Sequence, residues 1–171
     1  MTVQITPAPV RREVLVKASP EHAFKVFTDG FDRWWPRSHS IGESPLKEAR
    51  LEPGVGGRWL GILEDGTVAQ WGEVLVWEPP ARLVLAWRVT ADWRCDPDFL
   101  TEVEVRFTPE AAGVRVALEH RNLERYGEHA QRVADSVGAE GGWGGLPGMP
   151  WITNALIDVS PFSVPLPRRT T

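Results

Sequence analysis

Hydrophobic and polar residues alternate along the middle of the chain with the two-residue period of a β-strand. In residues 100–108 the apolar Val103, Val105 and Phe107 alternate with the charged Glu102, Glu104 and Arg106. Residues 114–120 repeat the pattern, with Val114, Val116, Leu118 and His120 on the predicted inner face. Such alternation is typical of an antiparallel sheet with one apolar face and one face in water.

The segment 71–88 predicts a β-hairpin at the centre of this sheet. Two runs rich in Val, Leu and Trp flank Pro79 and Pro80, and no helix continues through such a proline pair. The β-branched and aromatic residues of both runs favour strands. The second strand is expected to cover residues 82–91, with an inner face formed by Leu83, Leu85, Trp87 and Val89.

The remaining elements follow from local signals. Strands are predicted at residues 10–18, 46–51, 56–63 and 67–77. Ser19 is placed to cap a helix that begins at Pro20 and stops at Gly30, and residues 31–35 form a second short helical piece. Residues 123–137 are expected to be helical, with one side formed by Tyr126, Ala130, Val133 and Val137.

Composition and charge are consistent with the predicted sheet and helices and add few constraints. The chain has 171 residues, a net charge of −4 and 25% charged residues, so we expect one domain with irregular ends at 1–9 and 160–171. No basic stripe indicates nucleic acid, and no apolar run is long enough to span a membrane. The N-terminus has no hydrophobic signal segment, so a cytoplasmic location is expected.

Nine tryptophans are unusual for a chain of this size, since each buried indole N–H requires a partner. They either pack an ordinary core or line a cavity for an apolar or aromatic ligand. The predicted cavity residues are Trp35, His39, Trp59, Trp87, Val103, Val105, Phe107, Val116, Leu118, His120 and Trp143.

The order of elements and several local motifs resemble a known family. The motifs are Ala18-Ser19-Pro20 with Ala23, Phe24 and Phe27; Trp34-Trp35; Gly56-Gly57-Arg58-Trp59; Asp65-Gly66; Gly72-Glu73-Val74; Trp77-Glu78-Pro79-Pro80 with Arg82, Leu83 and Trp87; the strands 101–107 and 114–120; and Gly142-Trp143. Through them the chain is similar to the activator of heat-shock protein 90 ATPase-like family, within the START/birch-pollen-allergen helix-grip superfamily (SRPBCC). The resemblance spans residues 10–146. It implies an α+β helix-grip fold, in which a curved antiparallel sheet of about six or seven strands wraps a C-terminal helix, with a cavity between them.

The chain departs from this family after Leu146. Pro147, Gly148 and Pro150 interrupt the long final helix that the resemblance implies. The apolar residues of segment 151–158 are therefore expected to pack as a separate piece, either on the sheet or across a homodimer interface.

Candidate chemistry is sparse. Four scattered histidines, a lone Cys95 and the absence of a strand–glycine-loop–helix unit predict no metal and no nucleotide cofactor. His39 is either a solvated loop residue or a polar group at the cavity mouth, and His120 is either a hydrogen-bonded rim residue or an acid/base. Glu73 and Arg88 are expected to form an exposed pair, because Val74 and Val76 are better candidates for the inner face.

Three function classes remain open. The first is a non-enzymatic module that binds a small hydrophobic or aromatic ligand, which we rank first. The second is an enzyme of the cyclase, hydratase or hydrolase kind, and the third is a co-chaperone-like interaction domain, both suggested by the resemblance. A clustered pair of ionisable groups in the cavity favours an enzyme, and the lack of any favours binding.

Overall fold

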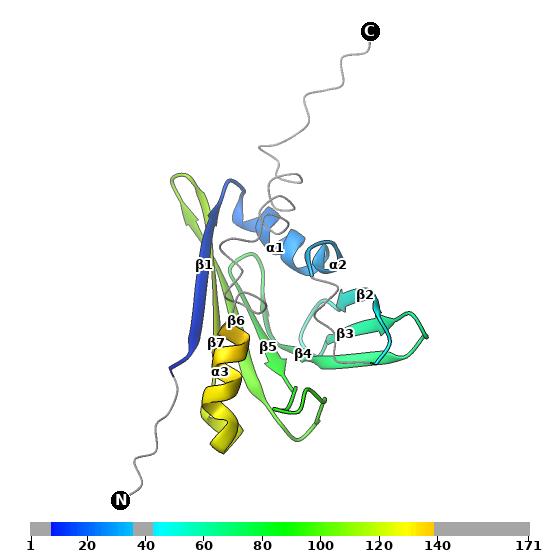
Figure 1. Cartoon of the computed structure of the whole chain (residues 1–171). Coiled ribbons are helices and arrows are strands. Elements are labelled where there is room, and N and C mark those ends of the chain that lie inside the picture. Colours follow the sequence, from blue (N-terminus) through cyan, green and yellow to red (C-terminus); the bar gives the residue numbers. More distant parts are fainter. Residues whose placement is uncertain (1–7, 36–42, 139–171) are drawn as a thin grey trace, which may run out of the picture.

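The computed structural model describes residues 8–35 and 43–138, and gives only the backbone of Arg33 and Trp34 (Figure 1). Its elements are β1 (Val10–Val16), α1 (Pro20–Thr28), α2 (Phe31–Trp34), β2 (Leu46–Leu51), β3 (Arg58–Leu63), β4 (Val68–Glu78), β5 (Arg82–Trp87), β6 (Thr101–Glu110), β7 (Gly113–Arg121), the 3-10 helix η1 (Leu123–His129) and α3 (Ala130–Gly138). His39, Trp143 and the C-terminal segment 151–158, with its predicted packing, lie outside the described residues.

All seven strands join in one antiparallel sheet with the order β1-β7-β6-β5-β4-β3-β2. Strands β2 to β7 therefore form a simple meander. Strand β1 pairs with β7 and forms the edge of the sheet opposite to β2. Figure 1 shows that the sheet curls, with α1 and α2 near one end of its concave side and α3 beside β1. This arrangement confirms the predicted α+β helix-grip architecture, including two short helices after the first strand.

The predicted inner face of the central strands is buried. None of its side chains on β5, β6 and β7 is more than 7% exposed: Leu83, Leu85, Trp87, Val103, Val105, Phe107, Val116, Leu118 and His120. Pairing in register places Leu83 beside Val105 and Val105 beside Leu118, so these side chains share the concave side of the sheet. Helix α1 packs there too, since the ring centroid of Phe24 lies 5.2 Å from that of Phe107.

Two predicted elements differ from the structure. Strand β5 ends at Trp87 rather than at residue 91, and Val89 makes only an isolated bridge to Cys95. The helix predicted at 123–137 is divided into the 3-10 helix η1 and the α-helix α3, and Gly127, whose φ of 60° is not helical, interrupts η1 itself. Its predicted buried side is nevertheless confirmed for Tyr126, Ala130, Val133 and Val137.

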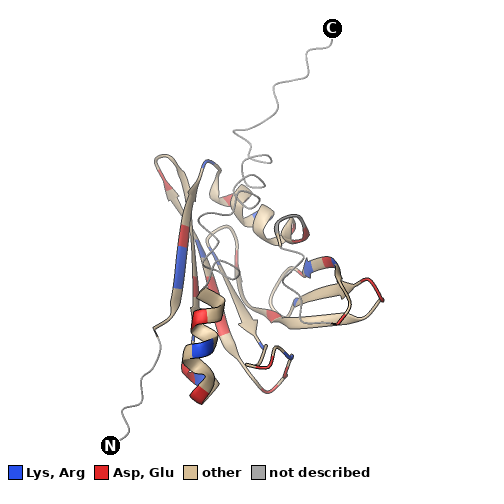
Figure 2. Ribbon diagram, in the orientation of Figure 1, with Lys and Arg blue, Asp and Glu red and all other residues tan. Residues whose placement is uncertain are grey.

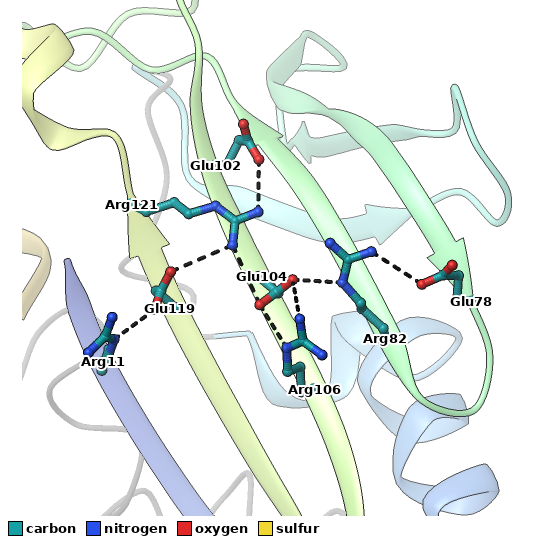
Figure 3. Close-up of polar contacts among 8 residues, drawn as sticks. All are labelled: Arg11, Glu78, Arg82, Glu102, Glu104, Arg106, Glu119 and Arg121. Atoms are coloured by element: carbon teal, nitrogen blue, oxygen red, sulfur yellow. Dashed lines mark hydrogen bonds and ion pairs between the residues drawn. The ribbon is translucent and has the colours of Figure 1, made fainter.

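The convex face carries a network of ion pairs centred on Glu104 (Figure 3). A carboxylate oxygen of Glu104 lies 2.7 Å from Nε of Arg82, and the other lies 2.9 Å from Nε of Arg106. Burial raises the pKa of Glu104, but hydrogen bonds from these arginines outweigh it, so the pKa lies below its ordinary value. Val84 and Ala86 also lie on this face, paired with Glu104 and Glu102 of β6, and both are buried.

Charged residues of both signs lie close together on β1 and on α3 (Figure 2). On α3 the buried side is formed by Ala130, Val133, Ala134 and Val137, which is the amphipathic pattern of a helix packed on a core. At the end of α3, Arg12 of β1 donates a hydrogen bond of 2.9 Å to the carbonyl oxygen of Gly138.

None of the helices in the described part of the chain combines the length and apolarity needed to cross a bilayer.

Candidate functional site

Four tryptophans gather at one end of the concave face, and we call Trp35, Trp59, Trp71 and Trp87 the Trp cluster. The ring centroids lie 5.4 Å apart for Trp35 and Trp71, 6.0 Å for Trp35 and Trp59, and 5.4 Å for Trp59 and Trp87. Phe31 stacks on Trp35 with a centroid distance of 5.0 Å. The four indoles, each at most 7% exposed, form a continuous aromatic wall.

Gly72 lies between Trp59 and Trp87 in the sheet. It pairs with Trp59 of β3 on one side and with Trp87 of β5 on the other. These two strands are about 10 Å apart, because adjacent strands are spaced by about 4.8 Å. The two rings nevertheless approach each other, with a centroid distance of 5.4 Å.

A β-bulge brings Trp71 into the cluster. Trp59 pairs with Gly72, whereas Leu60 pairs with Gln70, so Trp71 is an extra residue in β4. Both Trp71 and Gly72 then face the concave side. Strict alternation places Trp71 on the outer face, which is why the sequence analysis missed it. A second bulge between Val74 and Val76 pairs Val76 with Val84 on the outer face, so the prediction of an inward Val76 is wrong.

A strip of buried polar groups borders the cluster. Nε1 of Trp87 donates to the hydroxyl of Tyr126 at 3.0 Å, and that hydroxyl donates to the carbonyl oxygen of Val89 at 2.6 Å. Oγ1 of Thr101 lies 2.8 Å from Nε2 of His120. The imidazole also packs against Trp87, with a centroid distance of 5.2 Å. We call Thr101, His120 and Tyr126 the polar strip.

Burial keeps the ionisable members of the polar strip neutral. It lowers the pKa of His120 to about 3, and it raises the pKa of Tyr126 to about 12 against the opposing hydrogen bond from Trp87. At neutral pH these groups therefore offer hydrogen bonds rather than charge or a ready proton acceptor. His120 was expected at the rim, but it is fully buried.

We expect Tyr126→Phe to lower the free energy of unfolding by about 2 kcal/mol, because it leaves two buried polar groups, the Trp87 N–H and the Val89 carbonyl, without their partner. Urea denaturation of the full chain measures the loss. The control is a double-mutant cycle with Trp87→Phe, in which the two losses should be less than additive. A Tyr126→Phe protein as stable as the wild type would contradict the claim that the Tyr126 hydroxyl pairs with the Trp87 N–H and the Val89 carbonyl.

Nine of the predicted cavity residues are placed by the structure, all buried on or against the concave face: Trp35, Trp59, Trp87, Val103, Val105, Phe107, Val116, Leu118 and His120. These residues lie toward two opposite ends of the concave face. Phe107 lies beside α1, with Phe24 and Phe27 within 5.9 Å between ring centroids, whereas Trp59, Trp87 and His120 lie at the aromatic end. That they line a ligand cavity stays a prediction. Thr101 and the role of Tyr126 were not predicted, because the only signal for Tyr126 in the sequence was its place on the apolar side of a helix.

Glu73 and Arg88 pair on the outer face, as predicted, but they are not freely exposed. Both oxygens of Glu73 lie 2.8 Å from Nε of Arg88, and the side chains are 22% and 20% exposed. Arg88 also donates to the carbonyl oxygens of Pro97 and Phe99, because the loop after β5 folds back along the sheet. The pair therefore fixes this loop. Within residues 8–35 and 43–138, no group of three His, Cys, Asp or Glu is placed to hold a metal ion.

Comparison with known proteins agrees with this fold. The profile of the family described as Activator of Hsp90 ATPase homolog 1-like protein matches residues 17–146. The chain belongs to this family. A comparison with curated proteins gives no match.

Among solved structures, two proteins are similar to this chain in both fold and sequence. An anthrahydroquino-γ-pyrone synthase, Txn09, is 36% identical with a TM-score of 0.60, over 88% of this chain and 97% of that one. CalC of Micromonospora echinospora, described as a self-sacrificing resistance protein, is 30% identical with a TM-score of 0.59, over 90% and 96% of the two chains. Protein NE0264 of Nitrosomonas europaea, at 13% identity and a TM-score of 0.63 over 91% and 97% of the two chains, shares the fold.

Proposed function

We propose that this protein binds a planar, polycyclic aromatic small molecule against the concave face of its sheet. The observation that carries the proposal is the Trp cluster, a wall of four buried indoles beside neutral hydrogen-bonding groups. An aromatic pair contributes about 0.5–1.5 kcal/mol beyond the area that it buries, so a ligand with several fused rings gains more from this wall than an aliphatic ligand of equal size.

The polar strip supports a ligand that is neutral and carries oxygen atoms. His120 and Tyr126 are uncharged at neutral pH, so the groups that border the Trp cluster are polar but carry no charge, which suits a neutral ligand.

The similarity to Txn09 supports the same class of ligand. That protein is named as a synthase of an anthrahydroquino-γ-pyrone, and such a compound has fused rings and a carbonyl oxygen. Similarity of fold alone does not carry a function. The indoles of this chain therefore carry the proposal, and the similarity to Txn09 adds that the ligand has fused rings and a carbonyl oxygen.

Equilibrium dialysis of the full chain against xanthone, anthraquinone and an aliphatic acid of similar size tests the proposal. We expect saturable binding of one aromatic molecule per chain and none of the aliphatic acid. Trp87→Leu should weaken xanthone binding about tenfold, because it removes a ring from the wall. Trp93→Leu is the control, since Trp93 is 44% exposed on the loop after β5. Xanthone binding that does not saturate, or that Trp87→Leu leaves unchanged, would contradict the proposal.

A second candidate function is a cyclase-type enzyme, favoured by the clustered pair His120 and Tyr126. The lowered pKa of His120 makes it a weak proton acceptor near neutral pH. Its role in such an enzyme would be to polarise a carbonyl as a neutral hydrogen-bond donor. Mass spectrometry of a bound ligand after incubation separates the two functions, because a binding module returns it unchanged. The co-chaperone-like role has no support from a particular residue in the described part of the chain.

A further inference from the structure

Trp59 stands out within the Trp cluster because its N–H group is buried and has no partner among the described residues. The side chain is 0% exposed, and among the described residues nothing accepts a hydrogen bond from its Nε1. A buried donor left unpaired costs about 1–3 kcal/mol, and most buried polar groups in native proteins are paired. The neighbouring Trp87 follows that rule, since its Nε1 donates to Tyr126.

The surroundings of Trp59 are aromatic rings. Phe31 and Trp35 meet it edge to face, with centroids at 6.2 Å and 6.0 Å, and Trp71 lies at 6.0 Å. The hydroxyl of Tyr126 is already used, because it accepts from Trp87 and donates to Val89. The N–H group of Trp59, surrounded by rings, could therefore be paired by an acceptor atom of a bound ligand.

We infer that Nε1 of Trp59 donates a hydrogen bond to a ring carbonyl oxygen of the bound ligand, and so selects quinones, pyrones and related aromatic ketones over aromatic hydrocarbons. An indole N–H points outward in the plane of its ring, and the lone pairs of a ring carbonyl lie in the plane of the ligand, so the two meet edge to edge. The inference rests on the proposed function and adds to it a specificity-determining residue. A site built to hydrogen-bond one group rejects the analogue that lacks it.

The test uses 9-fluorenone and fluorene, planar molecules of the same shape that differ by the carbonyl oxygen. Equilibrium dialysis should give the wild-type chain about a tenfold preference for 9-fluorenone, the usual effect of one hydrogen bond. Trp59→Phe should reduce this preference to about twofold or less, with little change for fluorene. Trp71→Phe is the matched control, because it removes the same ring volume beside Trp59 and should keep the preference.

The outcomes separate the inference from the proposed function. A Trp59→Phe protein that keeps the wild-type preference overturns the inference, as does a wild type that binds both ligands equally, and in both cases the proposed function stands. Failure of the wild type to bind either ligand overturns the proposed function and the inference with it. If Trp59→Phe does not fold, replacement of Trp59 by β-(3-benzothienyl)alanine, which has sulfur in place of N–H, must give the same loss of preference.

Discussion

Gly72→Ala is expected to lower the free energy of unfolding by about 3 kcal/mol or more. A Cβ atom on Gly72 would lie 1.7 Å from the backbone carbonyl oxygen of Ala86, on the neighbouring central strand. Neither backbone can move away without disturbing β4 and β5, which hold the centre of the sheet.

The measurement is urea denaturation of the full chain, and Gly66→Ala provides the matched control. Gly66 has a φ of +85° in a hairpin turn, and nothing lies within 4 Å of a Cβ atom placed there. Only the backbone conformation opposes that substitution, so its cost should be about 1–2 kcal/mol. Equal losses for the two variants would mean that the strands adjust freely around Gly72 and that the packing argument is wrong.

Acidification from pH 6.5 toward pH 4.5 is expected to destabilise the fold by about 1.4 kcal/mol per pH unit through His120 alone. Burial lowers the pKa of this imidazole from 6.5 to about 3. Between those values the unfolded chain binds a proton that the folded chain excludes. The contribution of His120 is therefore fully present above pH 6.5, and it is lost progressively as the pH falls toward the folded pKa.

Denaturation at several pH values between 5 and 7, compared with His120→Gln, measures this effect. The range stays above the ordinary pKa of Glu104, whose own lowered pKa adds to the loss of stability in stronger acid. The variant should lose less stability per pH unit than the wild type. Identical pH dependence of the wild type and His120→Gln would show that His120 does not titrate as its burial demands.

The fold could be predicted because its signals are local. The alternation in residues 100–108 fixed which face of β6 is buried, and Pro79 and Pro80 fixed the turn between β4 and β5. The cap of α1 is confirmed in detail, since the amide of His22 donates to Oγ of Ser19 at 3.1 Å. Each of these features depends on residues a few positions apart in the sequence.

The site was only partly predictable because its deciding features are set by pairing between strands. The bulge that turns Trp71 inward is determined by the register of β4 against β3, and no local pattern marks it. The same holds for Tyr126, whose hydroxyl meets Trp87 across 39 positions of sequence. His120 was placed on the correct face, but its complete burial depends on the packing of the whole concave side.

The most direct test of the central claim follows the indole N–H signals of the nine tryptophans by nuclear magnetic resonance during a titration with xanthone. Single Trp→Phe variants assign the signals. The account predicts saturable shifts for the Trp cluster, that is for Trp35, Trp59, Trp71 and Trp87, with one xanthone per chain and little change at the exposed Trp93. Shifts confined to Trp93, or no saturable shift in the Trp cluster, would contradict it.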